Sequence, residues 1–210
     1  MDKPSNMTSF GAVARVRRML SQKAGKKVKV GHTGTLDPFA TGLLILLAGK
    51  ATKRAAEYSK KDKVYEATII LGSKSTTGDP EGEIETIEAA PKLSRAEIEK
   101  ALAQFIGHIK QRPPIYSAIK INGQRAYKLA RKGETFTMPE REVEIYSIEL
   151  LKWNSPELSI RCHVSSGTYI RTLAEDIAKA LGTVAYTQAL RRTQVGEYKL
   201  GDVKLFALDA

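Results

Sequence analysis

Apolar residues recur at helical spacing in three stretches of the chain, and each stretch is bounded by residues that start or stop helices. In the first stretch Val13, Val16 and Leu20 fall on one face, which predicts an amphipathic helix packed against a core. The predicted helices are residues 9–24 with Ser9 as cap and Gly25 as stop, a helix opened by the capping box of Ser94 and Glu97 and ended by Gly107, and residues 168–181 with Gly182 as stop.

Other stretches alternate apolar and polar residues, as half-buried strands do. They cover residues 63–71, 141–151 and 157–164, and the wholly apolar run Leu43–Ala48 predicts a further, buried strand. Helices and strands follow one another without regular alternation, so we predict an α+β fold with an antiparallel or mixed sheet rather than a doubly wound one. The sequence contains no dinucleotide fingerprint, internal repeat or long linker, so residues 1–210 are expected to form a single domain.

The composition narrows the class of protein. Of the 210 residues, 42% are hydrophobic and 27% are charged, as in globular domains. The single cysteine, Cys162, is expected in the core and excludes a disulfide framework or a multi-cysteine zinc site, while the three histidines are too scattered for a His-rich metal centre. No apolar run approaches the ~20 residues that cross a bilayer, and the start lacks a signal peptide. We therefore expect a protein of a reducing compartment, most simply the cytoplasm.

Positive charge is concentrated near the start of the chain. The net charge is +11, and residues 1–61 carry 13 Lys and Arg against 3 Asp and Glu. An excess of this size favours a polyanionic partner such as a nucleic acid. A basic surface without any ligand would have the same composition, so charge alone leaves both interpretations open.

The most unusual segment is Gly31–Gly42, which contains three glycines and a proline in twelve residues. It predicts a tightly shaped loop between a basic stretch and an apolar strand. Within it Asp37 precedes Pro38, which keeps the backbone of Asp37 out of the helical region. A carboxylate among positive charges is expected to stay ionised at neutral pH. Taken alone, the spacing favours an ordinary turn aspartate that bonds its own backbone.

A second candidate segment, Ser165–Arg171, combines a strand end, a glycine turn and a helix start. Arg171 could pair with a distant carboxylate through its planar guanidinium, although an arginine on a helix surface is the commoner case. With one cysteine and scattered histidines, the sequence offers no nucleophile–base pair that can be verified.

Five motifs follow one another along nearly the whole chain. They are Asp2-Lys3-Pro4 with Met7-Thr8-Ser9, residues 31–42 with Asp37, Lys63-Val64-Tyr65-Glu66 with Thr77, Asp79 and Gly82, residues 113–120 with Gly123, Arg125, Tyr127 and Arg131, and Gly167-Thr168-Tyr169-Ile170-Arg171 with Leu190-Arg191-Arg192. Together they resemble the motifs of the TruB-type tRNA pseudouridine synthases. The order of all five overturns the simpler interpretations of Asp37 and Arg171.

The resemblance implies a pseudouridine synthase fold, with a central mixed, largely antiparallel sheet flanked by helices and loops and a basic RNA-binding cleft. It implies that uridine at position 55 in the T-loop of tRNA is isomerised after base flipping, with the T-arm stem-loop as partner and with neither cofactor nor metal. Asp37 falls on the catalytic aspartate, Tyr65 on a tyrosine that stacks against the target base, and Arg171 on the arginine that pairs with the aspartate. The substrate-binding positions of the family, which line the uridine pocket or hold the flipped nucleotide, correspond to His32, Tyr169 and Leu190.

Bacterial members of the family usually carry a C-terminal RNA-binding PUA domain, and no segment here resembles one. We therefore expect a catalytic domain alone, acting as a monomer. Three alternatives are a non-catalytic RNA-binding module, a basic ribosomal protein and a metal-dependent hydrolase. The ribosomal alternative leaves Asp37 and Arg171 without a role, and the hydrolase lacks metal ligands. The RNA-binding module differs from the enzyme at Asp37, whose carboxylate only catalysis requires.

Overall fold

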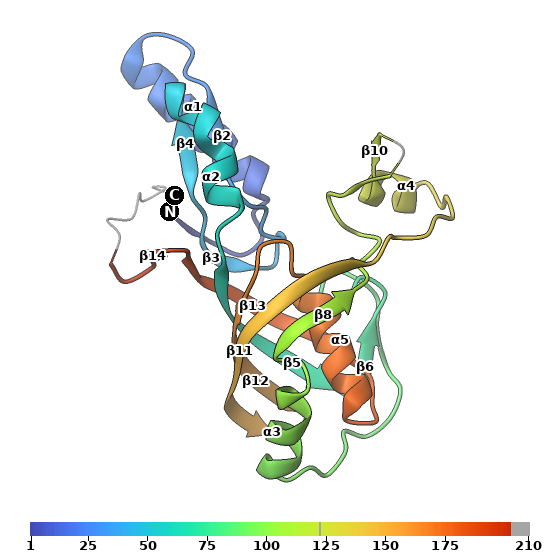
Figure 1. Cartoon of the computed structure of the whole chain (residues 1–210). Helices are drawn as coiled ribbons and strands as arrows, with labels where there is room; N and C mark the ends of the chain where they lie inside the picture. Colours follow the sequence, from blue (N-terminus) through green and yellow to red (C-terminus); the bar gives the residue numbers. More distant parts are fainter. Residues whose placement is uncertain (122, 203–210) are drawn as a thin grey trace. The chain divides into compact units, whose positions relative to one another are not determined.

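The structure of the chain is a computed structural model that describes residues 1–121 and 123–202 (Figure 1). The chain folds into two compact units, Met1–Glu66 with Ala189–Ala210 and Ala67–Gln188, which we call unit 1 and unit 2. The single domain expected over residues 1–210 stays a prediction, because compact units of this size also occur within one domain.

The largest part of the fold is an eight-stranded sheet. Its strands are, in chain order, β1 (Asp2–Lys3), β3 (Thr41–Leu43), β5 (Lys63–Leu71), β8 (Gly107–Gln111), β11 (Arg141–Asn154), β12 (Glu157–Val164), β13 (Ala185–Val195) and β14 (Tyr198–Lys199). The order in the sheet is β1-β3-β13-β5-β12-β11-β8, and β14 pairs with β13. β3 and β13 pair parallel, whereas β1 with β3, β8 with β11, β11 with β12 and β13 with β14 pair antiparallel. The predicted α+β class with a mixed, largely antiparallel sheet is therefore confirmed.

In unit 1 the first helix, α1 (Ser9–Ala24), has the predicted extent. It ends at Gly25, whose φ of 62° is the left-handed conformation that glycine adopts most easily. Its cap is Thr8, however, because the Thr8 side chain accepts a hydrogen bond from the N–H of Gly11. The prediction of Ser9 as cap is wrong, since the Ser9 hydroxyl bonds another segment of unit 1 instead.

The apolar run Leu43–Ala48 forms two short strands rather than the predicted single one. β3 ends at Leu43, and β4 (Leu46–Ala48) pairs with β2 (Val30–His32) in a separate two-stranded sheet. Between them the fully buried Leu44 donates its N–H to the Met1 carbonyl at 2.9 Å. An unbroken apolar run has no period, so the sequence pattern could not show this break. The elements after β4 are the 3-10 helix η1 (Gly49–Arg54) and α2 (Ala55–Ser59).

Besides its strands of the large sheet, unit 2 contains, in its described residues, three helices and two separate two-stranded sheets. These elements are β6 (Ser73–Ser75) paired with β7 (Ile84–Thr86), α3 (Arg95–Ala103), β9 (Lys120–Ile121) paired with β10 (Gln124–Arg125), α4 (Ala126–Arg131) and α5 (Ile170–Ala180). The capping box of Ser94 and Glu97 is confirmed at the start of α3. The helix ends at Ala103, before the predicted stop, because the N–H groups of residues 104–106 bond carbonyls three rather than four residues back, and Gly107 already begins β8. α5 begins two residues later than predicted, with Tyr169 at its cap position.

Burial follows the sequence pattern most closely in β5. Every second residue of this strand is buried, from Lys63 and Tyr65 to Leu71. In unit 2 the fully buried Cys162 confirms its expected place in the core, and α5 buries Leu173 and Ile177 completely. A buried leucine or isoleucine stabilises the fold by roughly 1.5–3 kcal/mol. Because every second residue of β5 is buried, the alternation that predicts this strand also places Tyr65 on the face that points into the core.

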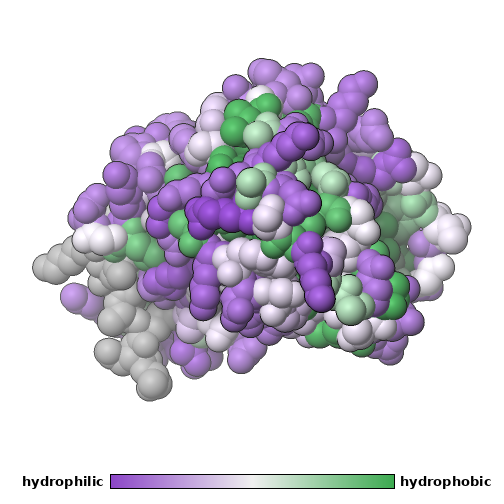
Figure 2. Space-filling view, turned by 90° about the horizontal axis from the view of Figure 1, so that it is seen from below, coloured by the Kyte–Doolittle hydropathy of each residue, from purple (hydrophilic) through white to green (hydrophobic). Residues whose placement is uncertain are grey.

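The surface shown in Figure 2 is covered mainly by hydrophilic residues, with smaller hydrophobic patches between them. Scattered apolar side chains of this kind are ordinary on protein surfaces. Across residues 1–121 and 123–202, no helix combines the length and the apolar character needed to span a bilayer.

Candidate active site

The segment that carries Asp37 is a loop of unit 1 between β2 and β3. Its neighbour Leu36 is 2% exposed, and both backbone groups of Leu36 bond the Ser9 hydroxyl, the N–H at 2.8 Å and the carbonyl at 2.9 Å. The Asp37 carbonyl accepts a hydrogen bond from the N–H of Ala40 at 3.1 Å. The backbone on either side of the half-buried Asp37 is thereby held by hydrogen bonds.

The ammonium of Lys3 holds the same loop from β1. Lys3 is completely buried, and its Nζ donates to the carbonyls of Pro4 at 2.7 Å, Met7 at 2.6 Å and Pro38 at 3.1 Å. A buried cation is stable only where such acceptors compensate for lost hydration. The residue directly after Asp37 is thus tied to the first motif of the chain.

Arg192 is the buried arginine that joins the Asp37 loop to β13. It is 2% exposed, and its guanidinium donates to the carbonyls of Gly34 at 3.0 Å and Leu43 at 2.8 Å. It also lies 3.5 Å from the hydroxyl of Tyr65 and 6.0 Å from the centre of that ring. A Cβ at Gly42 would lie 2.2 Å from the Arg192 carbonyl oxygen, so only glycine permits the approach of β3 to β13. Arg192 is therefore a shared partner of the Asp37 loop and of Tyr65.

Arg171 occupies the second position of α5 in unit 2 and is 4% exposed. Its Nη1 lies 3.1 Å from the carboxylate of Asp79 and donates to the Thr77 carbonyl at 2.8 Å. Its Nη2 donates to the Tyr116 carbonyl at 3.0 Å. Asp79 is itself held, because it accepts hydrogen bonds from the Thr77 hydroxyl and the N–H of Glu81. The guanidinium is therefore fixed in one orientation within unit 2.

Tyr169, at the cap of the same helix, is held by a side-chain amide. The buried Gln111 on β8 accepts from the N–H of Tyr169 at 2.7 Å and donates to its carbonyl at 3.0 Å. The guanidinium of Arg141 lies 5.0 Å from the centre of the Tyr169 ring, a cation–π distance. Both the backbone and the ring of Tyr169 are thus positioned by residues of unit 2.

Two ionisable groups beside these residues have displaced pKa values. The pKa of Lys63 is lowered to about 8, chiefly because burial disfavours the charged ammonium, and then because of the nearby cation Arg192. Burial raises the pKa of Glu175 on α5, although the positive charge of Arg171 opposes this shift. Burial is thus the main cause of both shifts, and the cation Arg192 adds to that of Lys63.

The structure places each predicted site residue in one of the two units. Asp37, Tyr65, His32 and Leu190 belong to unit 1. His32 lies on β2 opposite Leu46, and the 8%-exposed Leu190 lies on β13. Tyr169 and Arg171 belong to unit 2. Their catalytic and substrate-binding roles, and the pairing of Arg171 with Asp37, stay predictions.

Four residues that hold the site were not among the predicted site residues, namely Lys3, Asp79, Gln111 and Arg192. Three of them belong to the quoted motifs, and all four are charged or polar residues that the fold buries. Buried polar side chains need partners, but Gln111 and Arg192 lie on β8 and β13, which the sequence pattern did not predict as strands, so no local signal marked them as buried. In the part of the chain that the structure describes, no group of three or more His, Cys, Asp or Glu could hold a metal ion.

The comparisons with known proteins agree with one another. Residues 17–170 match the model of the TruB family pseudouridylate synthase N-terminal domain, and residues 171–210 match that of the tRNA pseudouridylate synthase B C-terminal domain. The chain is 48% identical over 202 residues to tRNA pseudouridine synthase B of Phocaeicola vulgatus, covering 96% of this chain and 86% of that protein. It is 46% identical to tRNA pseudouridine synthase B of Trichormus variabilis, covering 96% of this chain and 68% of that protein.

Solved structures show the same fold. A chain in the crystal structure of a Cbf5-Nop10-Gar1 complex superposes with a TM-score of 0.70 at 30% identity, and it is matched over 95% of this chain and 48% of its own length. A chain in the structure of an H/ACA RNP bound to a substrate RNA containing 2′-deoxyuridine superposes with a TM-score of 0.67 at 27% identity. The present chain therefore spans about half the length of these structural relatives.

Proposed function

Because the chain belongs to the TruB family of pseudouridylate synthases, it converts uridine to pseudouridine in tRNA, and we propose that its target is the uridine at position 55 of the T-loop. We also propose that Asp37 is the catalytic residue, and the observation that carries this role is how its loop is held in place. Ser9 bonds both backbone groups of Leu36, and Lys3 bonds the carbonyl of Pro38. Backbone that is held on both sides of Asp37 limits where its carboxylate can lie, and catalysis requires such preorganisation.

The proposed reaction is an isomerisation in which this carboxylate is the main reacting group of the protein. Uracil leaves its N1–C1′ bond, rotates and rejoins the ribose through C5, while the proton on C5 is lost and N1 gains one. Substrate and product are isomers, so the balance needs no oxidant, reductant or energy donor. Asp37 acts either as the nucleophile or as the group that removes a proton from the sugar. Tyr65 stacks against the detached base, a contact that contributes ~1–3 kcal/mol, and assists proton removal.

Arg171 pairs with Asp37 in this proposal and keeps its carboxylate ionised. The support is the rigid placement of the guanidinium by Asp79 and by the carbonyls of Thr77 and Tyr116. Such a guanidinium needs no reorganisation during the reaction, which is what makes electrostatic stabilisation effective. His32, Tyr169 and Leu190 line the uridine pocket in the same proposal.

The substrate is the T-arm stem-loop of tRNA, and the target base must leave its stack before Asp37 reaches it. Flipping opposes binding by a few kcal/mol, which contacts to the RNA backbone must offset. The excess of Lys and Arg that gives the chain its net charge of +11 supplies side chains that contact RNA phosphates. Binding of the RNA therefore weakens as the salt concentration rises. We propose that the enzyme acts in the cytoplasm as a monomer.

The test is incubation with an unmodified T-arm stem-loop followed by nucleoside analysis. The proposal predicts one pseudouridine per stem-loop from the wild-type protein and none from Asp37→Asn. Asp202→Asn, the same chemical change at an exposed position, is the matched control and is expected to react at the wild-type rate. An RNA that is bound by the wild-type protein yet left unmodified would instead support a non-catalytic RNA-binding module.

A further inference from the structure

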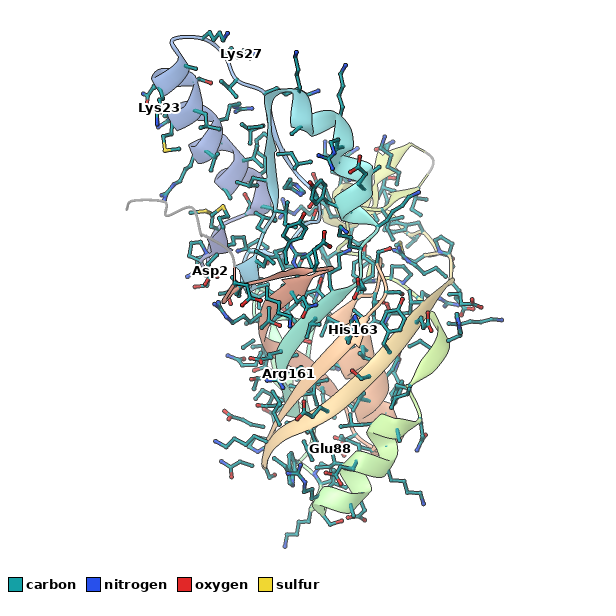
Figure 3. All side chains as sticks on the ribbon, turned by 60° about the vertical axis from the view of Figure 1, so that its left-hand side comes forward. Asp2, Lys23, Lys27, Glu88, Arg161 and His163 are labelled. Atoms are coloured by element: carbon teal, nitrogen blue, oxygen red, sulfur yellow. The ribbon has the colours of Figure 1, made fainter. Side chains whose placement is uncertain are left out.

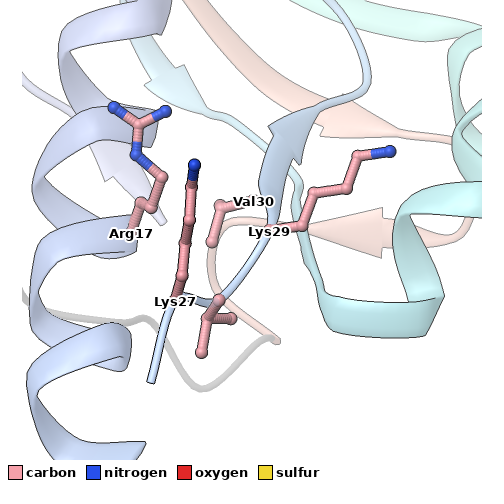
Figure 4. A pocket seen from close by; sticks show the side chains of 5 residues that line it. Arg17, Lys27, Lys29 and Val30 are labelled. Atoms are coloured by element: carbon pink, nitrogen blue, oxygen red, sulfur yellow. The ribbon is translucent and has the colours of Figure 1, made fainter. Parts of the chain in front are cut away.

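A hollow of about 400 Å³ lies in unit 1 between α1 and the stretch that leads into β2 (Figure 4). It is lined by Arg17, Lys27, Val28, Lys29 and Val30. Three of these five residues are cations and none is acidic, so the hollow attracts anions. None of them takes part in the candidate active site.

The side chains of two of these cations point in the same direction. Figure 4 shows the side chains of Arg17 and Lys27 extending side by side in the same direction, with Val30 next to Lys27, whereas Lys29 extends to the other side of the strand. Neither Arg17 nor Lys27 forms an ion pair with a carboxylate of residues 1–121 or 123–202. Two neighbouring cations repel each other, and an anion placed between them relieves that repulsion.

A phosphate is the anion that this pair fits. The planar guanidinium of Arg17 can bind two phosphate oxygens at once, and the ammonium of Lys27 adds a point charge. Val28 and Val30 contribute apolar surface to the lining, against which a sugar can pack.

An exposed aromatic ring beside the hollow favours RNA over other phosphate carriers. Phe10 is 66% exposed, and the guanidinium carbon of Arg17 lies 5.9 Å from the centre of its ring. The two residues are seven positions apart, so they share one face of α1. Exposed aromatic rings interleaved with cations are typical of surfaces that stack bases and bind the phosphate backbone.

Arg17 in the hollow lies away from the contact between α1 and the Asp37 loop. At its start α1 is bonded to the Asp37 loop through Ser9 and Leu36. Arg17 follows Ser9 by eight residues, which is about 12 Å along the helix axis. Lys23 and Lys27 are seen near the far end of α1 and in the stretch after it (Figure 3). A phosphate bound here therefore contributes to affinity rather than to the chemical step.

We propose that this hollow binds a backbone phosphate of the tRNA, with Arg17 and Lys27 as its cations and Phe10 as a stacking surface beside it. The proposal rests on the proposed function, because it takes tRNA as the partner. It assigns to the region around α1 and β2 the task of holding the substrate while the Asp37 loop does the chemistry.

The test is binding of an unmodified full-length tRNA to the whole chain, measured by fluorescence anisotropy at several salt concentrations. The double variant Arg17→Gln/Lys27→Gln is expected to bind about tenfold more weakly, the size of one lost charge-assisted contact. Its plot of log affinity against log salt is expected to be shallower by about one unit. Arg17→Lys in an otherwise wild-type chain keeps the charge but loses the planar fork, so its affinity should fall between the two. Phe10→Ala removes no charge and should weaken binding without changing the salt dependence.

The matched control is Lys92→Gln/Lys100→Gln, which removes the same charge from exposed positions of unit 2. Equal affinities for this control and the Arg17/Lys27 variant would overturn the proposal, and so would a Phe10→Ala variant that binds like the wild type. Turnover at saturating tRNA is measured in parallel and should match the wild type in all variants; a fall in turnover without a change in affinity would also overturn it. Failure of the wild-type protein to form pseudouridine would refute the proposed function alone, while the binding comparison would still decide the role of the hollow.

Discussion

The guanidinium of Arg171 lies 3.1 Å from the carboxylate of Asp79, and both side chains are 4% exposed. Such a buried pair fixes geometry, because either charge alone would lack compensation. The arginine that the proposed function pairs with Asp37 is thus anchored by another aspartate within unit 2. This anchoring predicts that Asp79 matters for catalysis although its own role is to position another residue.

Replacing Asp79 by asparagine should lower both stability and turnover. Removal of one partner of a buried ion pair typically destabilises the folded protein by about 3–5 kcal/mol. We expect a value at the lower end of this range, because Arg171 would still donate hydrogen bonds to the carbonyls of Thr77 and Tyr116. Urea unfolding measures the first effect and single-turnover pseudouridine formation the second. Asp176→Asn breaks an exposed ion pair with Lys179 and should change stability by no more than about 1 kcal/mol. Wild-type turnover in Asp79→Asn would show that the pair is only structural.

Gln111 offers a test of how Tyr169 is held. Gln111→Leu fills a similar volume but leaves the N–H and the carbonyl of Tyr169 without their side-chain partners, which should destabilise the fold by about 2 kcal/mol. Because Tyr169 begins α5, the rate of pseudouridine formation at saturating RNA should also fall. The control is Gln104→Leu at an exposed position. Unchanged kinetics in the folded fraction of Gln111→Leu would rule out a positioning role.

Lys3 tests whether the Asp37 loop depends on the start of the chain. Lys3→Met keeps the aliphatic stem and removes the ammonium from three carbonyls, including that of Pro38. Loss of the charge-assisted bonds should destabilise unit 1 by about 3 kcal/mol, and turnover should fall because the loop loses its anchor. Thermal unfolding and turnover of Lys23→Met, an exposed lysine of α1, provide the comparison. A Lys3→Met protein as stable and active as this control would refute the anchoring role.

The buried ammonium of Lys63 should make stability rise with pH in the alkaline range. Its pKa is about 8 in the folded chain against 10.5 for a free lysine side chain, so between these values the unfolded chain binds more protons. Stability relative to a Lys63→Met variant should therefore increase from about pH 8 toward pH 10.5. The gain should be about 1–2 kcal/mol, because partial exposure screens the effect. Urea unfolding of both proteins across this range measures it, and parallel curves would contradict the lowered pKa.

Local signals in the sequence predicted much of the fold. The alternation in residues 63–71 and 157–164 matches β5 and β12, and the capping box at Ser94 begins α3. The break inside Leu43–Ala48 could not be predicted, because two different partner strands impose it. The five motifs identified the family, which the comparisons confirm.

The site itself was only partly predictable, because its supports are distant in sequence. Arg192 bonds the carbonyl of Gly34, 158 residues away, and Gln111 bonds Tyr169, 58 residues away. No local period encodes such contacts. The motifs include Lys3, Ser9 and Arg192, but they do not show that these side chains hold the Asp37 loop.

The central claim is that the carboxylate of Asp37 makes pseudouridine at position 55 of tRNA. It is tested most directly with a tRNA that carries tritium on C5 of that uridine alone, mixed with excess protein in a single turnover. We predict that the wild-type protein releases the label completely, whereas Asp37→Asn binds the same tRNA with unchanged affinity and releases none. Release by Asp37→Asn at the wild-type rate, or retention of the label by a wild-type protein that has bound the tRNA, would contradict the account.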